Sequence, residues 1–78
     1  MKTVILPIQF KLLLLDGQTN EKLFGVRVET NNKTYYTNLQ GEVSIPKDEK
    51  IKKISYISYS DVNNIKITND TILTLKSF

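Results

Sequence analysis

The chain alternates short runs of β-branched and aromatic residues with clusters of Gly, Asn, Asp and Pro. No segment of ten residues repeats its apolar side chains with the period of 3.6 residues that an amphipathic helix needs. Apolar residues recur instead at every second position, which is typical of strands that bury one face. The pattern therefore predicts an all-β fold.

The first strand is expected over residues 8–14. Ile8, Phe10, Leu12 and Leu14 alternate with other residues there and should share the core face, while the polar residues between them point outward. Later strands are expected at 26–29, 33–37, 42–45, 51–59, 62–68 and 71–76. Seven short strands separated by turns predict a seven-stranded antiparallel β-sandwich of the immunoglobulin-like or prealbumin-like type.

Two details of these strands are predicted as well. Val26 and Val28 should face the core, and so should Leu73 and Leu75. In the strand at 51–59 the apolar side chains change phase midway, which predicts a bulge or a strand that makes contacts on both faces.

The length of 78 residues fits one domain, spanning 1–78, with no cysteine to form a disulfide. We therefore expect modest stability unless a partner covers part of the surface. The apolar N-terminal stretch 1–15 is interrupted by Pro7, Gln9 and Lys11, and it is too short to cross a bilayer as a helix. We expect it to supply the first strand, without a signal peptide or membrane insertion. A native Met1 would then imply a virion or cytoplasmic location, and a removed leader would imply the cell envelope.

The residue inventory argues against catalysis. The chain has no histidine and no cysteine, so it lacks an ordinary general base at neutral pH, a Ser-His pair and nitrogen or sulfur ligands for a metal. Its acidic residues do not follow the spacing of a calcium-binding loop. A net charge of +3 falls short of a nucleic-acid-binding composition. We predict no enzymatic activity and assign no catalytic, cofactor-binding or metal-binding residue.

Exposed apolar and aromatic residues are the best candidates for binding a partner. Tyr35 and Tyr36 are neighbours on one strand, so they must point to opposite faces, and at least one should lie outside the core. Leu13, Leu15 and Phe24 either mark a docking patch or cap the ends of the sandwich. We assign Leu13, Tyr35 and Tyr36 as the partner-binding candidates.

A lysine cluster offers a second type of site. Lys47, Lys50, Lys52 and Lys53 form the densest group of charges, interrupted only by two acidic residues and an isoleucine. A solvated loop and strand end that guards against edge pairing is the simpler interpretation, and a phosphate or other anion site is the alternative.

Four segments, at 15–16, 19–28, 37–45 and 54–59, together resemble the carboxypeptidase regulatory-like domain family. In that family an aspartate ends the first strand, a threonine-rich loop with a leucine and a glycine precedes the second, and a Thr-Asp-x-x-Gly turn precedes the fourth. The strand here reading Ile-Ser-Tyr-Ile-Ser-Tyr is similar to the family's "vSYiGY" strand. The resemblance covers nearly the whole chain.

Two positions depart from the family pattern. Asn38 stands where the turn aspartate is usual, and its carbonyl oxygen is expected to cap the turn in the same way. Ser58 stands where a glycine is usual and adds only a small side chain. The resemblance implies a prealbumin-like sandwich without catalytic residues. Such domains accompany carboxypeptidases, precede outer-membrane receptors of the Bacteroidota, and occur in surface and phage proteins.

These observations favour a structural or interaction module. The leading hypothesis is a small accessory, or decoration, subunit that docks onto a protein partner in a larger assembly such as a phage virion or capsid, or a surface complex. A carbohydrate-binding module that uses Tyr35 or Tyr36 and the Asn-rich loops is the alternative from another class. A third possibility is the excised N-terminal accessory domain of an outer-membrane receptor or surface protein.

Overall fold

The protein is described by a computed structural model that covers residues 8–78. The prediction that the stretch 1–15 supplies the first strand is tested only from Ile8 onward, because residues 1–7 lie outside the described range. The seven strands are β1 (Gln9–Asp16), β2 (Arg27–Thr30), β3 (Thr34–Tyr36), β4 (Glu42–Pro46), β5 (Ile51–Ser55), β6 (Val62–Ile65) and β7 (Thr71–Leu75). The all-β prediction is confirmed. Within residues 8–78 no helix has the length and apolar character needed to span a membrane.

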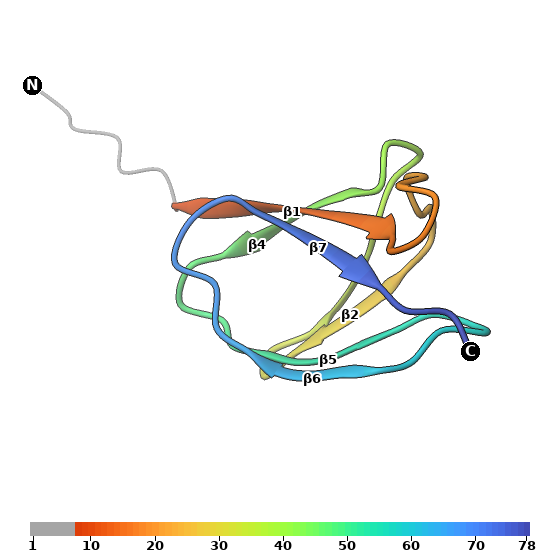
Figure 1. Cartoon of the computed structure of the whole chain (residues 1–78). Helices are drawn as coiled ribbons and strands as arrows, with labels where there is room; N and C mark the ends of the chain where they lie inside the picture. The colour runs from red at the N-terminus through yellow and green to blue at the C-terminus, as the bar shows by residue number, and fades with distance from the viewer. Residues whose placement is uncertain (1–7) are drawn as a thin grey trace, which may run out of the picture.

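Two sheets face each other, as Figure 1 shows. One sheet has three strands in the order β4-β1-β7, and the other has four in the order β3-β2-β5-β6. The prediction of a wholly antiparallel sandwich is wrong at one position, because β1 and β7 are parallel, with Leu14 opposite Leu73. Each connection reverses the direction of the chain. Because six connections separate β1 from β7, the two strands run in the same direction, and they pair in parallel where they lie side by side.

The core lies between the sheets and follows the predicted alternation, except at the start of the first strand. Ile8 was expected on the core face, but it precedes β1 and is 55% exposed, and Phe10 is half-buried. Leu12, Leu14, Val26 and Val28 have no exposed surface, as the period-two pattern predicts. The complete set of buried apolar side chains is Leu12, Leu14, Leu23, Val26, Val28, Val43, Ile45, Ile51, Ile54 and Leu75. Leu73 is half-buried and packs against this set, so both inward-facing leucines of β7 contribute to the core.

The fifth strand is shorter than predicted. It ends at Ser55, and residues 56–59 form a turn in which the Tyr59 N–H donates to the Tyr56 carbonyl oxygen at 3.1 Å. Ser58 has a φ of 70°, which stops the strand and explains the change of apolar phase. A register irregularity does occur in β5, but earlier, where Glu29 pairs with Lys53 and Thr30 pairs with Ile51. Strand β6 likewise ends at Ile65, three residues before its predicted end.

The alternating strand directions sort the connections onto two ends of the sandwich (Figure 1). We call one the apolar end; it comprises residues 17–26, 36–41, 56–61 and 76–78. We call the other the basic end; it comprises residues 31–33, 47–50 and 66–70, with the adjoining residues of β5 and β6.

Candidate functional site

Exposed apolar side chains are concentrated at the apolar end. Seven large hydrophobic residues are exposed in the described part of the chain, and five belong to this end: Phe24, Tyr36, Leu39, Ile57 and Phe78. Ile57 and Phe78 are 85% and 91% exposed. Single exposed apolar residues are ordinary, but a group of five at one end of a small domain is a candidate interaction surface.

Backbone hydrogen bonds join the first two segments of this end. The Gly25 N–H donates to the Thr37 carbonyl oxygen at 3.0 Å, and the Thr37 N–H donates to the Val26 carbonyl oxygen at 3.1 Å. The buried Thr37 hydroxyl donates to the Leu23 carbonyl oxygen at 2.6 Å and accepts from the Val26 N–H at 2.9 Å. These bonds fix the segment carrying Phe24 against the one carrying Tyr36 and Leu39.

The other two segments are joined in the same way. The Phe78 N–H donates to the Ser58 carbonyl oxygen at 3.1 Å, which holds Phe78 beside the turn that carries Ile57. Gly25, Arg27, Ser55, Tyr56 and Ile57 line a shallow groove of about 470 Å³. Since this groove runs from Gly25 to Ile57, it links the Phe24 segment to the Ile57 turn.

A carboxylate inside the apolar end holds its loops together. Asp16, the last residue of β1, is buried and accepts backbone N–H bonds from Gln18 at 2.7 Å and Thr19 at 2.9 Å. The Tyr59 hydroxyl donates to its other oxygen at 2.5 Å. The bond from Tyr59, followed by those two backbone bonds, lowers the pKa of Asp16 to about 2. The same bond raises the pKa of Tyr59 to about 12.

The Asn38 side chain caps the turn before β4, as predicted. Asn38 Oδ1 accepts from the backbone N–H groups of Gln40 at 2.9 Å and Glu42 at 3.0 Å, so the side chain caps the turn. Gly41 completes the turn with a φ of 74°. A Cβ at this position would lie 2.9 Å from the Leu14 carbonyl oxygen, and the turn therefore packs directly on β1.

The basic end is held by a second carboxylate. Glu49 accepts hydrogen bonds from the Thr30 hydroxyl at 2.6 Å and from the Tyr35 hydroxyl at 2.8 and 2.9 Å. The Thr30 hydroxyl is the largest cause of a lowered pKa at Glu49. Burial, followed by the bond to Glu49, raises the pKa of Tyr35 to about 12. The Lys33 ammonium lies 5.1 Å from the centre of the Tyr35 ring, within cation–π range.

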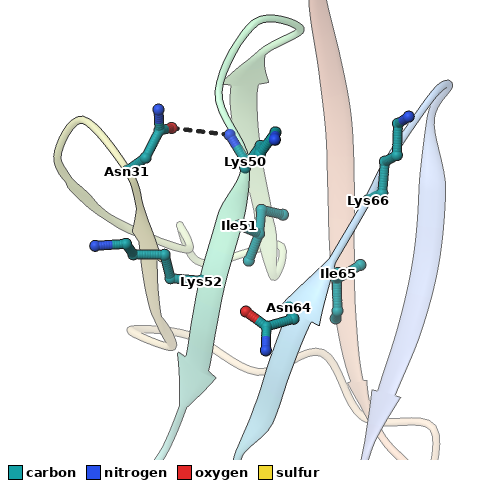
Figure 2. A pocket seen from close by; sticks show the side chains of 7 residues that line it. All are labelled: Asn31, Lys50, Ile51, Lys52, Asn64, Ile65 and Lys66. Atoms are coloured by element: carbon teal, nitrogen blue, oxygen red, sulfur yellow. Dashed lines mark hydrogen bonds between the residues drawn. The ribbon is translucent and has the colours of Figure 1, made fainter.

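A groove of about 410 Å³ lies between β5 and β6 at the basic end. Its lining residues are Asn31, Lys50, Ile51, Lys52, Asn64, Ile65 and Lys66 (Figure 2). Two of the four clustered lysines, Lys50 and Lys52, therefore line one groove. Lys53 does not line it, and its ammonium pairs with Asp61 at 3.4 Å.

The three predicted partner-binding residues do not form one surface. Leu13 is half-buried on the outer face of the three-stranded sheet, opposite the exposed Ile72 in the β1–β7 register. Tyr35 is half-buried, with its hydroxyl on Glu49. Tyr36 is 61% exposed, so the prediction that at least one of the two tyrosines lies outside the core is confirmed.

Sequence reasoning missed several residues of both surfaces. Leu39 carries a signal in the sequence, because an apolar residue in a polar turn has no core to enter. Ile57 falls within the strand predicted at 51–59. Lys66, Asn31 and Asn64 come together with the lysine cluster only through strand pairing.

The Asp16 and Glu49 carboxylates are both held by hydrogen bonds within the fold. Within residues 8–78 no three potential metal-ligating side chains gather. No family model, curated protein or solved structure was found to match this chain.

Proposed function

We propose that the chain is a non-catalytic interaction module, a small accessory subunit that docks by its apolar end onto a protein partner in a larger assembly such as a phage virion or capsid, or a surface complex. The observation that carries the proposal is the gathering of five exposed large hydrophobic side chains at one end of the sandwich. Burying them against a partner would contribute roughly 25 cal/mol for each Å² of apolar surface removed from water.

The arrangement of this end supports docking of a rigid surface. Hydrogen bonds between loops fix the backbone behind Phe24, Leu39 and Phe78, so a partner need not order the loops when it binds. The aromatic and aliphatic character of the group suits the core of a protein interface.

The carbohydrate-binding alternative has less support. It would use Tyr35 or Tyr36 as a stacking surface, but Tyr35 is half-buried and bonded to Glu49. Of the four tyrosines only Tyr36 is exposed, and it belongs to the apolar end. We therefore favour a protein partner over a glycan.

We further propose the carboxypeptidase regulatory-like family as the origin of the module. The immunoglobulin constant fold places its first, second, fourth and fifth strands in one sheet. Here the first, fourth and seventh strands form one sheet, which favours the prealbumin-like alternative. Gly25 and Gly41, at two of the family's three glycine positions, both have positive φ, and so does Ser58 at the third. This agreement of backbone geometry supports the resemblance.

The docking proposal is tested by the mass and composition of the native complex that a tagged chain recovers from its own source. We expect one dominant protein in a fixed ratio, and loss of that complex in the variant Ile57→Asn. The control is Ile72→Asn, which changes a residue of the same type, 65% exposed, on the outer face of the three-stranded sheet. Both variants should fold, because both side chains are exposed. Recovery of a free monomer, or equal loss of the complex in both variants, would overturn the proposal.

A further inference from the structure

The outer edge of β7 lacks the protection that the other three sheet edges carry. Strand β3 is only 3 residues long, β4 ends at Pro46, and β6 contains Asn64, whose φ is positive. Short length, proline and an irregular backbone each discourage a further strand from pairing with an edge. Strand β7 consists of Thr, Ile and Leu only, without charge, proline or positive φ. Within residues 8–78 no strand pairs with its outer edge (Figure 1).

The backbone of β7 offers hydrogen bonds along this edge. The Leu75 carbonyl oxygen faces β1, since it accepts the Gly17 N–H at 2.9 Å. The backbone groups of alternate residues in a strand point to opposite edges, so those of Ile72 and Thr74 face away from β1. An extended segment laid beside β7 could therefore bond to both residues.

Apolar side chains on both faces of this edge are incompletely covered. On the outer face Ile72 is 65% exposed. On the inner face Leu73, Ile65 and Ile67 pack against the core yet are only half-buried. A strand added to β7 would cover both groups and remove apolar surface from water. The occupant that fits is an extended segment with apolar side chains on both of its faces.

Strand β7 of a second copy meets this requirement, because its own Ile72 and Leu73 point to opposite faces. Antiparallel pairing about a two-fold axis at Ile72 would place this residue opposite its counterpart and bond the free backbone groups of both strands. The axis cannot lie much farther along the strand. The Lys76 carbonyl oxygen already accepts the Ser60 N–H at 2.8 Å, which closes the edge beyond Leu75.

The charges that flank β7 are complementary in this register. Asp70 precedes the strand and Lys76 follows it, and within residues 8–78 neither takes part in an ion pair. Asp70 Oδ1 accepts the Lys11 backbone N–H at 2.8 Å, which leaves Oδ2 for a further contact. Asp70 of one copy would lie opposite Thr74 of the other and diagonal to its Lys76, a separation that a long side chain spans.

We infer that two copies of this chain associate edge to edge through β7, which joins their three-stranded sheets into one continuous sheet. The symmetry forms each contact between Asp70 and Lys76 twice. Since β7 lies outside the apolar end, this association does not depend on docking by that end.

The test is analytical ultracentrifugation of the full chain from about 10 μM to about 1 mM, combined with amide hydrogen exchange. We expect a monomer–dimer equilibrium, with protection of the Ile72 and Thr74 amides that increases with the dimer fraction. A monomer over the whole concentration range would overturn the inference, and so would a dimer in which these two amides stay unprotected.

Variants locate the interface. Ile72→Lys places like charges opposite each other at the axis and should weaken the dimer about thirtyfold. The matched control is Ile8→Lys, which adds the same charge at an isoleucine that is 55% exposed and belongs to neither surface. It should leave the dimer within about twofold of the unchanged chain. Equal weakening by Ile8→Lys would contradict the inference, because net charge alone would then explain it.

A further pair of variants separates this inference from docking by the apolar end. Ile57→Asn should lose the partner complex and keep the dimer, whereas Ile72→Lys should keep the partner complex and lose the dimer. Failure of either proposal is therefore distinguishable from failure of the other. Loss of the dimer in Ile57→Asn would assign self-association to the apolar end and overturn the inference.

Discussion

The two ends of the sandwich are held by the same kind of hydrogen bond but expose different side chains. At each end a tyrosine hydroxyl donates to a carboxylate from a distant part of the chain, Tyr59 to Asp16 at the apolar end and Tyr35 to Glu49 at the basic end. The end that contains the first carboxylate carries five of the exposed large hydrophobic residues, and the end that contains the second has lysines and asparagines beside its groove. Buried polar bonds thus shape the loops at both ends, and the outward side chains decide what each end can bind.

The two carboxylates differ in what else they hold. Asp16 accepts two backbone N–H groups in addition to Tyr59, so it organises the start of the β1–β2 loop. Glu49 accepts the side-chain hydroxyls of Thr30 and Tyr35, and a side-chain hydrogen bond from Asn32 also lowers its pKa. The Asp16 carboxylate therefore holds backbone groups as well as a side chain, whereas the Glu49 carboxylate holds side chains.

The turn at Gly41 should be the most sensitive backbone position. In Gly41→Ala the new Cβ would lie 2.9 Å from the Leu14 carbonyl oxygen and 3.1 Å from the Leu23 nitrogen, at a φ of 74°. Both atoms belong to the backbone, so relief requires β1 or the neighbouring loop to move. We expect a loss of about 3 kcal/mol in the free energy of unfolding, measured by urea denaturation.

Gly25→Ala is the matched control at the same end. Its φ is 80°, yet a Cβ there would meet no atom within 4 Å. Only the conformational cost remains, about 1 to 2 kcal/mol. Equal losses in the two variants would show that the close approach of the 38–41 turn to β1 contributes nothing to stability.

Acid should weaken the apolar end through Asp16. Its pKa falls from 3.8 in the unfolded chain to about 2 in the folded protein, so its contribution is present above about pH 4 and is lost as the pH falls through 2. Tyr59→Phe removes the largest cause of the shift. We expect the pKa of Asp16, measured by NMR titration of its carboxyl carbon, to rise toward its ordinary value, and the acid dependence of stability to become shallower.

The corresponding substitution at the basic end, Tyr35→Phe, should shift the pKa of its carboxylate less. In Tyr35→Phe the Thr30 hydroxyl, which is the largest cause of the lowered pKa of Glu49, remains in place. The pKa of Glu49 should therefore rise less than that of Asp16 rises in Tyr59→Phe. A larger rise at Glu49 would reverse the comparison and make the tyrosine the main support of the basic end.

The sequence was most informative where one face of a strand is buried. Alternation in β1 and β2 placed Leu12, Leu14, Val26 and Val28 in the core, because a shift of one residue would move each strand's apolar side chains to the other face. It did not predict the parallel pairing of β1 with β7, since pairing between the chain's two ends has no local pattern. It also extended β5 through Tyr56–Tyr59, whose aromatic residues are favourable in strands although the backbone turns there.

The candidate surfaces were only partly predictable for a similar reason. For the lysine cluster the sequence favours a solvated loop over an anion site. Which of these lysines lie beside one groove depends on strand pairing, and Lys53 pairs instead with Asp61. Lys66 joins Lys50 and Lys52 across the β5–β6 pair, in which Ile51 lies opposite Ile65. At the apolar end the loops carrying Phe24, Leu39 and Ile57 meet because alternate connections return to the same end, which becomes visible only when all seven strands are placed.

The smallest predicted effect also compares the two ends, through one residue of positive φ in each. Ser58, in the turn of the apolar end, has a φ of 70°, and Asn64, in the groove of the basic end, has a φ of 53°. Glycine adopts this conformation without steric cost, and asparagine tolerates it far better than serine. Ser58→Gly should therefore raise the free energy of unfolding by about 1 kcal/mol, and Asn64→Gly should change it by less than about 0.5 kcal/mol, both measured by urea denaturation. If Asn64→Gly stabilised the chain as much as Ser58→Gly, asparagine would bear as much strain at this φ as serine does, and its tolerance of the left-handed conformation would not explain its presence here.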